Sequence, residues 1–256
     1  MDSKSILDRF EILFSTDSRF SDLRRFYIDN DKNSLYRILS GFTNSPLIEA
    51  VKLIDNPDFV PDCLSRGQVK SKLWLIEELA KLEKKQNLKL GTIFLCGGWY
   101  AILAAMLFEQ NFDINKVRSF DIDDSCRAIA ETFNKKWVMQ DWKFKSCTQD
   151  IHDINYSTHV YYVNRSDGSQ CELTDSPDTI INTSCEHIEN FKSWYNKIPA
   201  GKIVILQTNN YFEIPEHINC SKTIDDFAEQ TPMTEVLYSG ELFLDKYLRF
   251  MRIGIK

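Results

Sequence analysis

From Leu90 to the C-terminus, short apolar runs alternate with segments of helical spacing. Buried strands are indicated by "TIFLC", "VRSFDID", "WKFKSC", "DTIINTS" and "KIVILQT", and helices by "AILAAMLFEQ", "SCRAIAETFNKKW" and "ENFKSWYNKI". Strands that alternate with helices indicate βαβ units, in which a mainly parallel sheet is covered on both faces. The sequence therefore predicts a doubly wound α/β domain over residues 88–256.

Two segments depart from this alternation. The stretch "HVYYVNRSDGSQCELT" has two β-prone arms around Asp167 and Gly168, which predicts a hairpin inserted at about residues 157–174. The C-terminal runs "EVLYSGELF" and "YLRFMRIGIK" leave no room for a full crossover helix between them. We therefore expect them to form an antiparallel pair.

Residues 1–87 are predicted to form an N-terminal helical region. Helical spacing is visible in "SILDRFEILF", "SPLIEAVKLI" and "KSKLWLIEELAKLEKK". This region is expected to cover the substrate side of the domain as a lid. Arg66, near the start of the last helix, is a candidate for binding an anionic substrate group. The alternative is that it belongs to the solvated face of that helix.

Charge and composition limit the kinds of molecule that the protein is expected to bind. The net charge of −6 argues against a protein that coats nucleic acid through phosphate contacts alone, although nucleic acid is not excluded. No apolar run is long enough to span a membrane, and "MDSKSILDRF" lacks the apolar core of a signal peptide. The seven dispersed cysteines are typical of reduced thiols. We expect a cytoplasmic protein with a small-molecule substrate and no membrane partner, in an oligomeric state left open.

The segment "LCGGWY" is the candidate ligand turn, because a buried strand leads into two glycines and then a helix. In a doubly wound sheet, ligands bind beyond the carboxyl ends of the strands. A dinucleotide site needs G-x-G-x-x-G, but counting from Gly97 the second and third glycines are replaced by Trp99 and Ile102. A pyrophosphate would meet side chains there. The turn therefore favours a ligand without a pyrophosphate.

S-adenosylmethionine has no phosphate and needs an acid for its ribose and a polar group for its adenine. Asp121 ends the next strand, roughly 20 residues beyond the turn, as expected for a ribose-binding acid. Asp150 follows the third strand, where it could meet the adenine amino group, and Ile151 could pack on the ring. The candidate cofactor-binding residues are Cys96, Gly97, Gly98, Trp99, Tyr100, Asp121, Ile122, Asp150, Ile151, Asn182 and Thr183.

With these features the chain resembles the class I S-adenosylmethionine-dependent methyltransferases, which are Rossmann-like. The resemblance covers residues 88–256 and rests on "LCGGWY", "FDID", "TQDI", "DTIINTSCEHI" and "IPAGKIVILQTNN". It implies a seven-stranded, mostly parallel sheet that ends in an antiparallel hairpin, with S-adenosylmethionine as cofactor. The chain departs from the family at Leu95, where the family has an acid, and at Trp99 and Ala101, where it has glycines.

The resemblance also places the chemistry after the fourth strand, in "NTSCEH". Glu186 and His187 are the candidate catalytic pair, because an acid beside an imidazole holds its tautomer and raises its basicity. The alternative is that His187 only hydrogen-bonds the start of a helix. In some related O-methyltransferases E-x-x-E-H binds a metal, but Thr183 replaces the first glutamate, so no metal is predicted. The amides expected to read a polar substrate are Gln207, Asn209 and Asn210.

Three functions remain open at this point. The first is methyl transfer, by direct displacement, to a small or medium-sized polar acceptor. The second is transfer of the aminocarboxypropyl group of the same cofactor. The third is a catalytically silent protein that uses the fold for binding or as a scaffold.

Overall fold

The computed structural model describes residues 61–110, 112–165 and 167–256, without the side chains of Pro61, Leu64 and Arg66. The helices predicted within residues 1–60 lie outside the described residues. Residues 60–256 belong to one structural unit. In the part of the chain that is described, no helix has the length and apolar character needed to cross a membrane.

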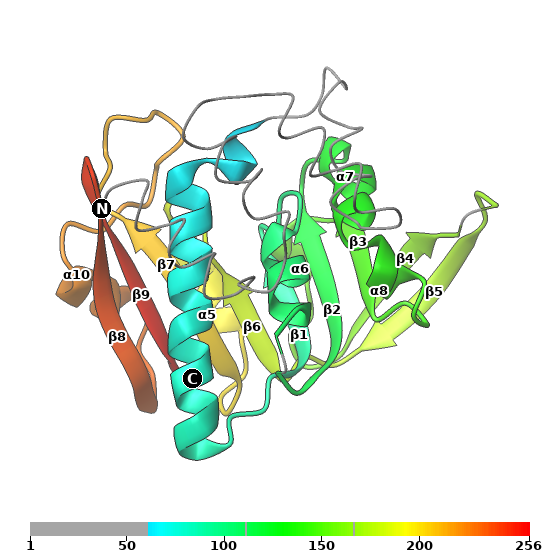
Figure 1. The fold of residues 1–256 in the computed structure, drawn as a ribbon, viewed down its shortest axis with the longest axis horizontal. Coiled ribbons are helices and arrows are strands. Elements are labelled where there is room, and N and C mark those ends of the chain that lie inside the picture. Colours follow the sequence, from blue (N-terminus) through cyan, green and yellow to red (C-terminus); the bar gives the residue numbers. More distant parts are fainter. Residues whose placement is uncertain (1–60, 111, 166) are drawn as a thin grey trace, which may run out of the picture. The chain divides into compact units, whose positions relative to one another are not determined.

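A seven-stranded sheet forms the centre of this unit (Figure 1). Its strands follow the order β3-β2-β1-β6-β7-β9-β8, in which β9 runs antiparallel to β7 and β8 and the other neighbours are parallel. This confirms the predicted doubly wound sheet with an antiparallel C-terminal hairpin. The strands are β1 (Gly91–Cys96), β2 (Ile114–Asp121), β3 (Phe144–Thr148), β6 (Thr179–Asn182), β7 (Ile203–Asn209), β8 (Glu235–Leu244) and β9 (Tyr247–Ile255).

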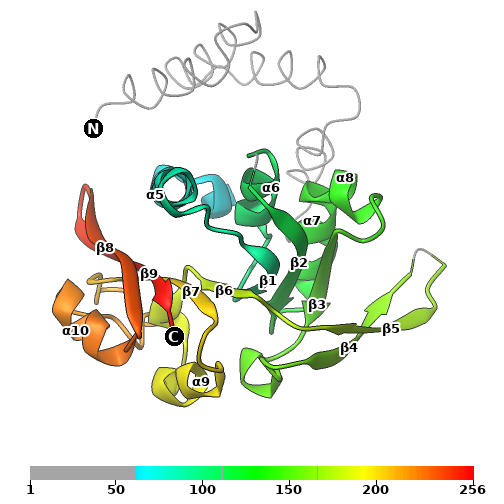
Figure 2. The same cartoon turned by 90° about the horizontal axis from the view of Figure 1, so that it is seen from below.

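Helices cover both faces of the sheet (Figure 2). One face carries α5 (Arg66–Gln86), α6 (Ile102–Phe108), α7 (Ser125–Phe133) and α8 (Lys135–Val138), and the other carries α9 (Phe191–Lys197) and α10 (Ile224–Gln230). The apolar run of β1 serves both cores, because Ile93 and Leu95 join one buried cluster while Phe94 and Cys96 join the other. Short 3-10 turns are η2 (Pro61–Leu64), η3 (Ile151–Asp153) and η4 (Cys185–His187).

Helix α5 is part of the α/β unit. Its apolar stripe, which includes Trp74, Leu75 and Leu79, is buried in the same cluster as the sheet. The indole Nε1 of Trp74 donates a hydrogen bond of 3.1 Å to the hydroxyl of Tyr238 on β8. The helix was expected to belong to a separate region ending at residue 87, but its apolar face has the sheet as its partner.

The predicted insertion is a two-stranded antiparallel hairpin of β4 (His159–Asn164) and β5 (Gln170–Asp175). It is tied to the main sheet by Arg118 of β2, whose Nε donates to Oδ2 of Asp175 at 2.7 Å. The hydroxyl of Tyr161 donates to the same oxygen at 2.6 Å. Both charged side chains are buried, so a buried ion pair anchors the hairpin to β2.

Candidate active site

A cleft of about 1370 Å³ lies at the carboxyl ends of the parallel strands. Its walls come from the ends of β1, β2, β3, β6 and β7, from the start of β9, and from the first turn of α5. Pockets for a single small molecule usually measure about 300–1,000 Å³. The cleft is therefore large enough for two reactants side by side.

The turn after β1 forms one wall of the cleft. Gly97 lies there with φ +63°, a backbone conformation that favours glycine. At Gly98 a Cβ atom would lie 2.0 Å from Oγ of Ser119 on β2, so a side chain would not fit between the two strands. A Cβ at Gly97 would lie 3.9 Å from Nδ2 of Asn182, which is buried without a hydrogen-bond partner in the described structure.

Asp121 joins the two loops that follow β1 and β2. Its Oδ2 accepts from the backbone N–H of Trp99 at 2.7 Å, and its Oδ1 accepts from the N–H of Asp123 at 3.1 Å. The indole of Trp99 also lines the cleft and stacks on Tyr100, with ring centroids 4.9 Å apart. A carboxylate has about four acceptor positions, so Asp121 keeps capacity for a ligand.

The segment after β3 forms the next wall. Oδ1 of Asp150 accepts from the N–H of His152 at 2.8 Å and so caps η3. The carbonyl of Ile151 accepts from the buried hydroxyl of Tyr156 at 2.8 Å, and this hydroxyl accepts from Nε1 of Trp194 at 2.6 Å. Ile151 is thereby held at the wall of the cleft.

The structure divides the predicted cofactor-binding residues into two groups. Those that line the cleft are Gly97, Trp99, Asp121, Ile122, Asp150 and Ile151. Those that lie behind its surface are Cys96, Gly98, Tyr100, Asn182 and Thr183, of which Cys96, Tyr100 and Asn182 are buried.

The other half of the cleft is built around a buried ion pair. Glu186 is 1% exposed and Arg249 is 4% exposed. Oε1 of Glu186 accepts from Nη2 of Arg249 at 2.6 Å and from Nδ2 of Asn209 at 2.7 Å, whereas Oε2 has no partner in the described structure. Nη1 of Arg249 donates to Oγ of Ser71 on α5 at 3.3 Å.

Two histidine rings stand beside this pair, with centroids 4.7 Å apart. Nδ1 of His187 lies 3.0 Å from the carbonyl of Glu216, and Nδ1 of His217 lies 2.7 Å from the carbonyl of Tyr211. Glu186 and His187, predicted as a catalytic pair, share no hydrogen bond in the described structure. Oε1 of Glu186 is bound by Arg249 and Asn209, and Nδ1 of His187 faces a backbone carbonyl. His217 belongs to no sequence motif and was not predicted.

The predicted substrate amides separate by depth. Asn209 lines the cleft at the end of β7. Gln207 does not, because it is fully buried one pleat deeper, where its Oε1 accepts from Oγ of Ser71 at 2.7 Å. Oδ1 of Asn210 accepts from the N–H of Leu248 at 2.8 Å, away from the cleft lining. Arg66 is the first residue of α5, and its side chain lies outside what the structure describes.

A buried lysine adjoins the ion pair. Burial, and then the charge of Arg249, lower the pKa of Lys72 to about 8. Nζ of Lys72 donates at 2.6 Å to Oε1 of Gln68, which lines the cleft. No sequence pattern indicates this lysine, because its burial depends on how α5 packs.

The fold of this chain is that of known methyltransferases. It aligns with the N-methyltransferase NodS from Bradyrhizobium japonicum WM9, crystallised with S-adenosyl-L-homocysteine, at a TM-score of 0.53 and 9% identity over 82% of this chain and 99% of NodS. A candidate sarcosine dimethylglycine methyltransferase from Galdieria sulphuraria aligns at 0.50 and 9% identity over 74% and 86% of the two chains. No protein-family model matches the sequence. No curated protein is similar to it in sequence.

Proposed function

We propose that the protein is an S-adenosylmethionine-dependent methyltransferase acting on a small or medium-sized polar acceptor. The observation that carries this proposal is the arrangement of Gly97, Asp121 and Asp150 at three neighbouring strand ends, beside a polar half that contains Glu186 and His187. The fold shared with NodS, which was crystallised with S-adenosyl-L-homocysteine, supports it.

The residues of the cleft fit a cationic cofactor without phosphates. Among the side chains that are described, Arg249 is the one lysine or arginine in the cleft lining, and Glu186 already neutralises it. A pyrophosphate would therefore find no free cationic side chain there. The cofactor half instead presents Asp121 and Asp150, and the unpartnered amide of Asn182 points toward Gly97. The two acids suit the hydroxyls of a ribose and the amino group of an adenine, and their negative charge favours a sulfonium.

Each half of the cleft then has a defined task. The cofactor, when bound, supplies an electrophilic methyl group on sulfur. Gly97 leaves room for the ligand, Asp121 would accept hydrogen bonds from the ribose hydroxyls, and Asp150 would accept one from the adenine. Methyl displacement depends mainly on alignment and on removal of a proton from a hydroxyl acceptor. Nε2 of His187 is the group that would take this proton, because Nδ1 is bound to a backbone carbonyl.

Calorimetric titration with S-adenosylmethionine and S-adenosyl-L-homocysteine tests the cofactor. Asp121→Asn should weaken binding at least about 10-fold, the value of one hydrogen bond to a charged group. The matched control is Asp123→Asn, on the same loop but outside the cleft lining, which should bind as the wild type does. Absence of binding by the folded wild-type protein would contradict the proposal.

Mass spectrometry of metabolite and RNA pools incubated with protein and cofactor tests the reaction. A methyl increment on a product supports methyl transfer, whereas an aminocarboxypropyl increment supports the alternative transferase. Binding without any product would favour a catalytically silent protein. Full turnover by both His187→Ala and Glu186→Ala would exclude the proposed proton acceptor.

A further inference from the structure

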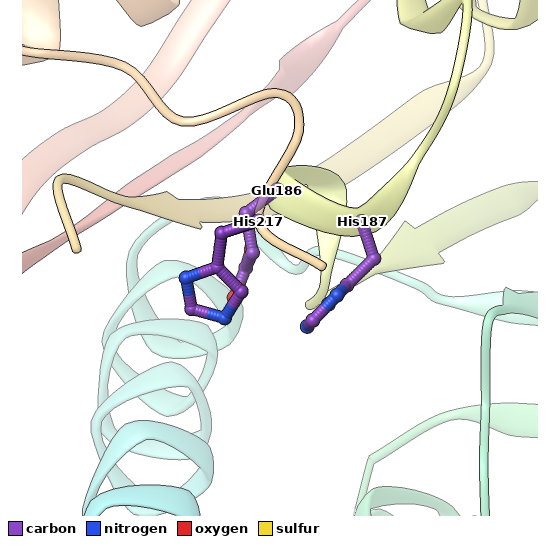
Figure 3. A group of neighbouring side chains, drawn as sticks. All are labelled: Glu186, His187 and His217. Carbon is purple, nitrogen blue, oxygen red and sulfur yellow. The ribbon is translucent and has the colours of Figure 1, made fainter. Parts of the chain in front are cut away.

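Glu186, His187 and His217 each bring one potential ligand atom to within 4.8 Å of the others (Figure 3). Glu186 and His187 come from η4, and His217 comes from the loop between β7 and α10. We propose that these three side chains bind a divalent transition-metal ion at the acceptor half of the cleft. The site stands on its own geometry, and only the role given to the ion below depends on the proposed methyltransferase function.

Both imidazoles are oriented as metal ligands are. The Nδ1 atoms of His187 and His217 each lie within hydrogen-bond distance of a backbone carbonyl. Because a carbonyl oxygen only accepts, each Nδ1 must carry the proton, which leaves the lone pair on Nε2. Histidines that bind metals usually donate their second nitrogen in this way, and the bond fixes both the tautomer and the ring orientation.

The carboxylate supplies an independent observation. Oε2 of Glu186 is buried and has no hydrogen-bond partner in the described structure, whereas Oε1 is held by Arg249 and Asn209. Leaving a buried charged oxygen without a partner is costly. A cation between the two histidines and this oxygen would satisfy it. In Glu186, Oε1 is therefore held in place by two hydrogen bonds, and Oε2 is free to bind an ion.

The three ligand atoms lie too far apart to bind one ion without a small movement toward one another. Bonds of about 2.1 Å in a tetrahedral arrangement place two ligand atoms about 3.4 Å apart. The atoms of this cluster, at up to 4.8 Å, must therefore approach one another by up to about 1.4 Å. His187 is exposed and His217 is half-buried, so both side chains, together with their partner carbonyls in the loop after β7, can shift toward the fixed carboxylate without disturbing the core.

The donor set indicates the class of metal. Two imidazole nitrogens and one carboxylate suit zinc or cobalt better than calcium or magnesium, which prefer oxygen ligands. Three protein ligands leave positions that face the cleft. If the protein is a methyltransferase, these positions would bind the oxygen atom of a hydroxyl acceptor and make its proton more acidic. His187 would then serve as a ligand in place of the proton acceptor proposed for the metal-free site, and the proton would pass to solvent.

Sequence reasoning predicted no metal because Thr183 stands where E-x-x-E-H has its first glutamate. The residues of that motif are contiguous in the sequence and follow a single strand. His217 lies 30 residues beyond His187 and reaches the cluster only through the loop after β7. The structure therefore supplies a ligand that the linear pattern does not contain.

The test is titration of tag-free apoprotein with Co²⁺ alone, followed by its visible absorption spectrum, with Zn²⁺ as competitor and Mg²⁺ for comparison. We expect one tight Co²⁺ site that Zn²⁺ displaces and Mg²⁺ does not. His187→Ala and His217→Ala should each weaken Co²⁺ binding at least about 100-fold, since loss of a mere supporting residue costs about 10–100-fold. Circular dichroism should show that both variants stay folded.

The matched control is His152→Ala, which removes a histidine that also lines the cleft but lies outside the cluster. It should bind Co²⁺ as the wild type does. Equal binding by wild type and the His187→Ala/His217→Ala double variant would overturn the proposal, as would equal loss in His152→Ala. Because no cofactor is present, failure here leaves the methyltransferase proposal standing. Cofactor binding measured on the same proteins tests that function separately.

Discussion

Two buried arginine–carboxylate pairs hold different parts of this molecule. The pair of Arg118 and Asp175 anchors the hairpin, and its buried nitrogen and oxygen atoms all have partners. The pair of Arg249 and Glu186 lies at the cleft, and both Nε of Arg249 and Oε2 of Glu186 are buried without partners. Buried polar groups are normally satisfied. The difference indicates that the first pair is structural and that the second retains capacity for a ligand.

A lysine lies beside each ion pair, and the two lysines differ in their exposure to solvent. Lys116 is about half-exposed and lies 3.3 Å from Oδ1 of Asp175, so it adds charge to a complete network. Lys72 is buried, and its pKa is lowered to about 8 by burial and then by Arg249. For Asp175, burial raises the pKa, but the Tyr161 hydrogen bond and the Arg118 charge outweigh it and lower the pKa overall.

The largest effect should follow Asp175→Asn. Both oxygens of Asp175 accept hydrogen bonds, so the new amide group must face a donor and the buried Arg118 loses its counter-charge. We expect the free energy of unfolding, measured in urea, to fall by about 3–5 kcal/mol. Binding of S-adenosyl-L-homocysteine to the folded fraction should be unchanged.

The control for this prediction is Glu172→Gln, an exposed residue on the same strand, which should leave stability nearly unchanged. A loss below about 1 kcal/mol for Asp175→Asn would show that the hairpin is held by other contacts.

Glu186→Gln should have a smaller effect on stability. The amide group can occupy the place of the unpartnered Oε2, while Oε1 still accepts from Arg249 and Asn209. Arg249 also loses its counter-charge, so we expect a loss of about 3 kcal/mol, at the low end of the range for a broken buried pair because no acceptor oxygen in use is lost. Urea unfolding of both variants side by side gives the comparison. If Glu186→Gln costs as much as Asp175→Asn, the two pairs do not differ in the way that their unpaired atoms indicate.

Lys72→Met should raise stability at pH 7 by about 1–2 kcal/mol, because it removes a buried charge at the cost of the bond to Gln68. The folded pKa of about 8 is below the unfolded value, so the charged form destabilises the wild type below pH 8. This cost is relieved as the pH rises toward the unfolded value. Urea unfolding from pH 7 to 10 should therefore show the advantage of the variant shrinking; a constant difference would refute the argument.

The smallest effect is the acid response of the hairpin pair. The pKa of Asp175 is lowered in the folded protein, so its contribution is complete above the unfolded value near 3.9 and is lost as the pH falls through the folded value. Wild type should lose more unfolding free energy than Asp175→Asn when the pH falls from 5 to 3. Parallel curves for the two proteins would mean that Asp175 titrates alike in both states.

The sequence predicted the sheet and the position of Gly97, Asp121 and Asp150 at one edge of it, because both depend on local patterns. Strand ends are readable from apolar periodicity. Asp121 is the last residue of β2, and Gly97 and Asp150 follow the ends of β1 and β3. The half of the cleft around Glu186 and Arg249 depends on how deeply each side chain is buried and on elements far apart in the sequence. Gln207 and Asn209 lie on the same face of β7, but Gln207 is buried under α5. His217 belongs to the loop after β7. No local pattern distinguishes such residues.

The backbone of the turn after β1 is strained at two residues. Trp99 and Ala101 adopt φ +48° and +49°, a left-handed backbone that costs a non-glycine residue roughly 1–2 kcal/mol. Glycine would relieve this cost at both positions. The chain instead gives up stability to place an indole at the cleft and Ala101 at the start of α6. The turn thus keeps a strained backbone at two residues, one of which, Trp99, lines the cleft.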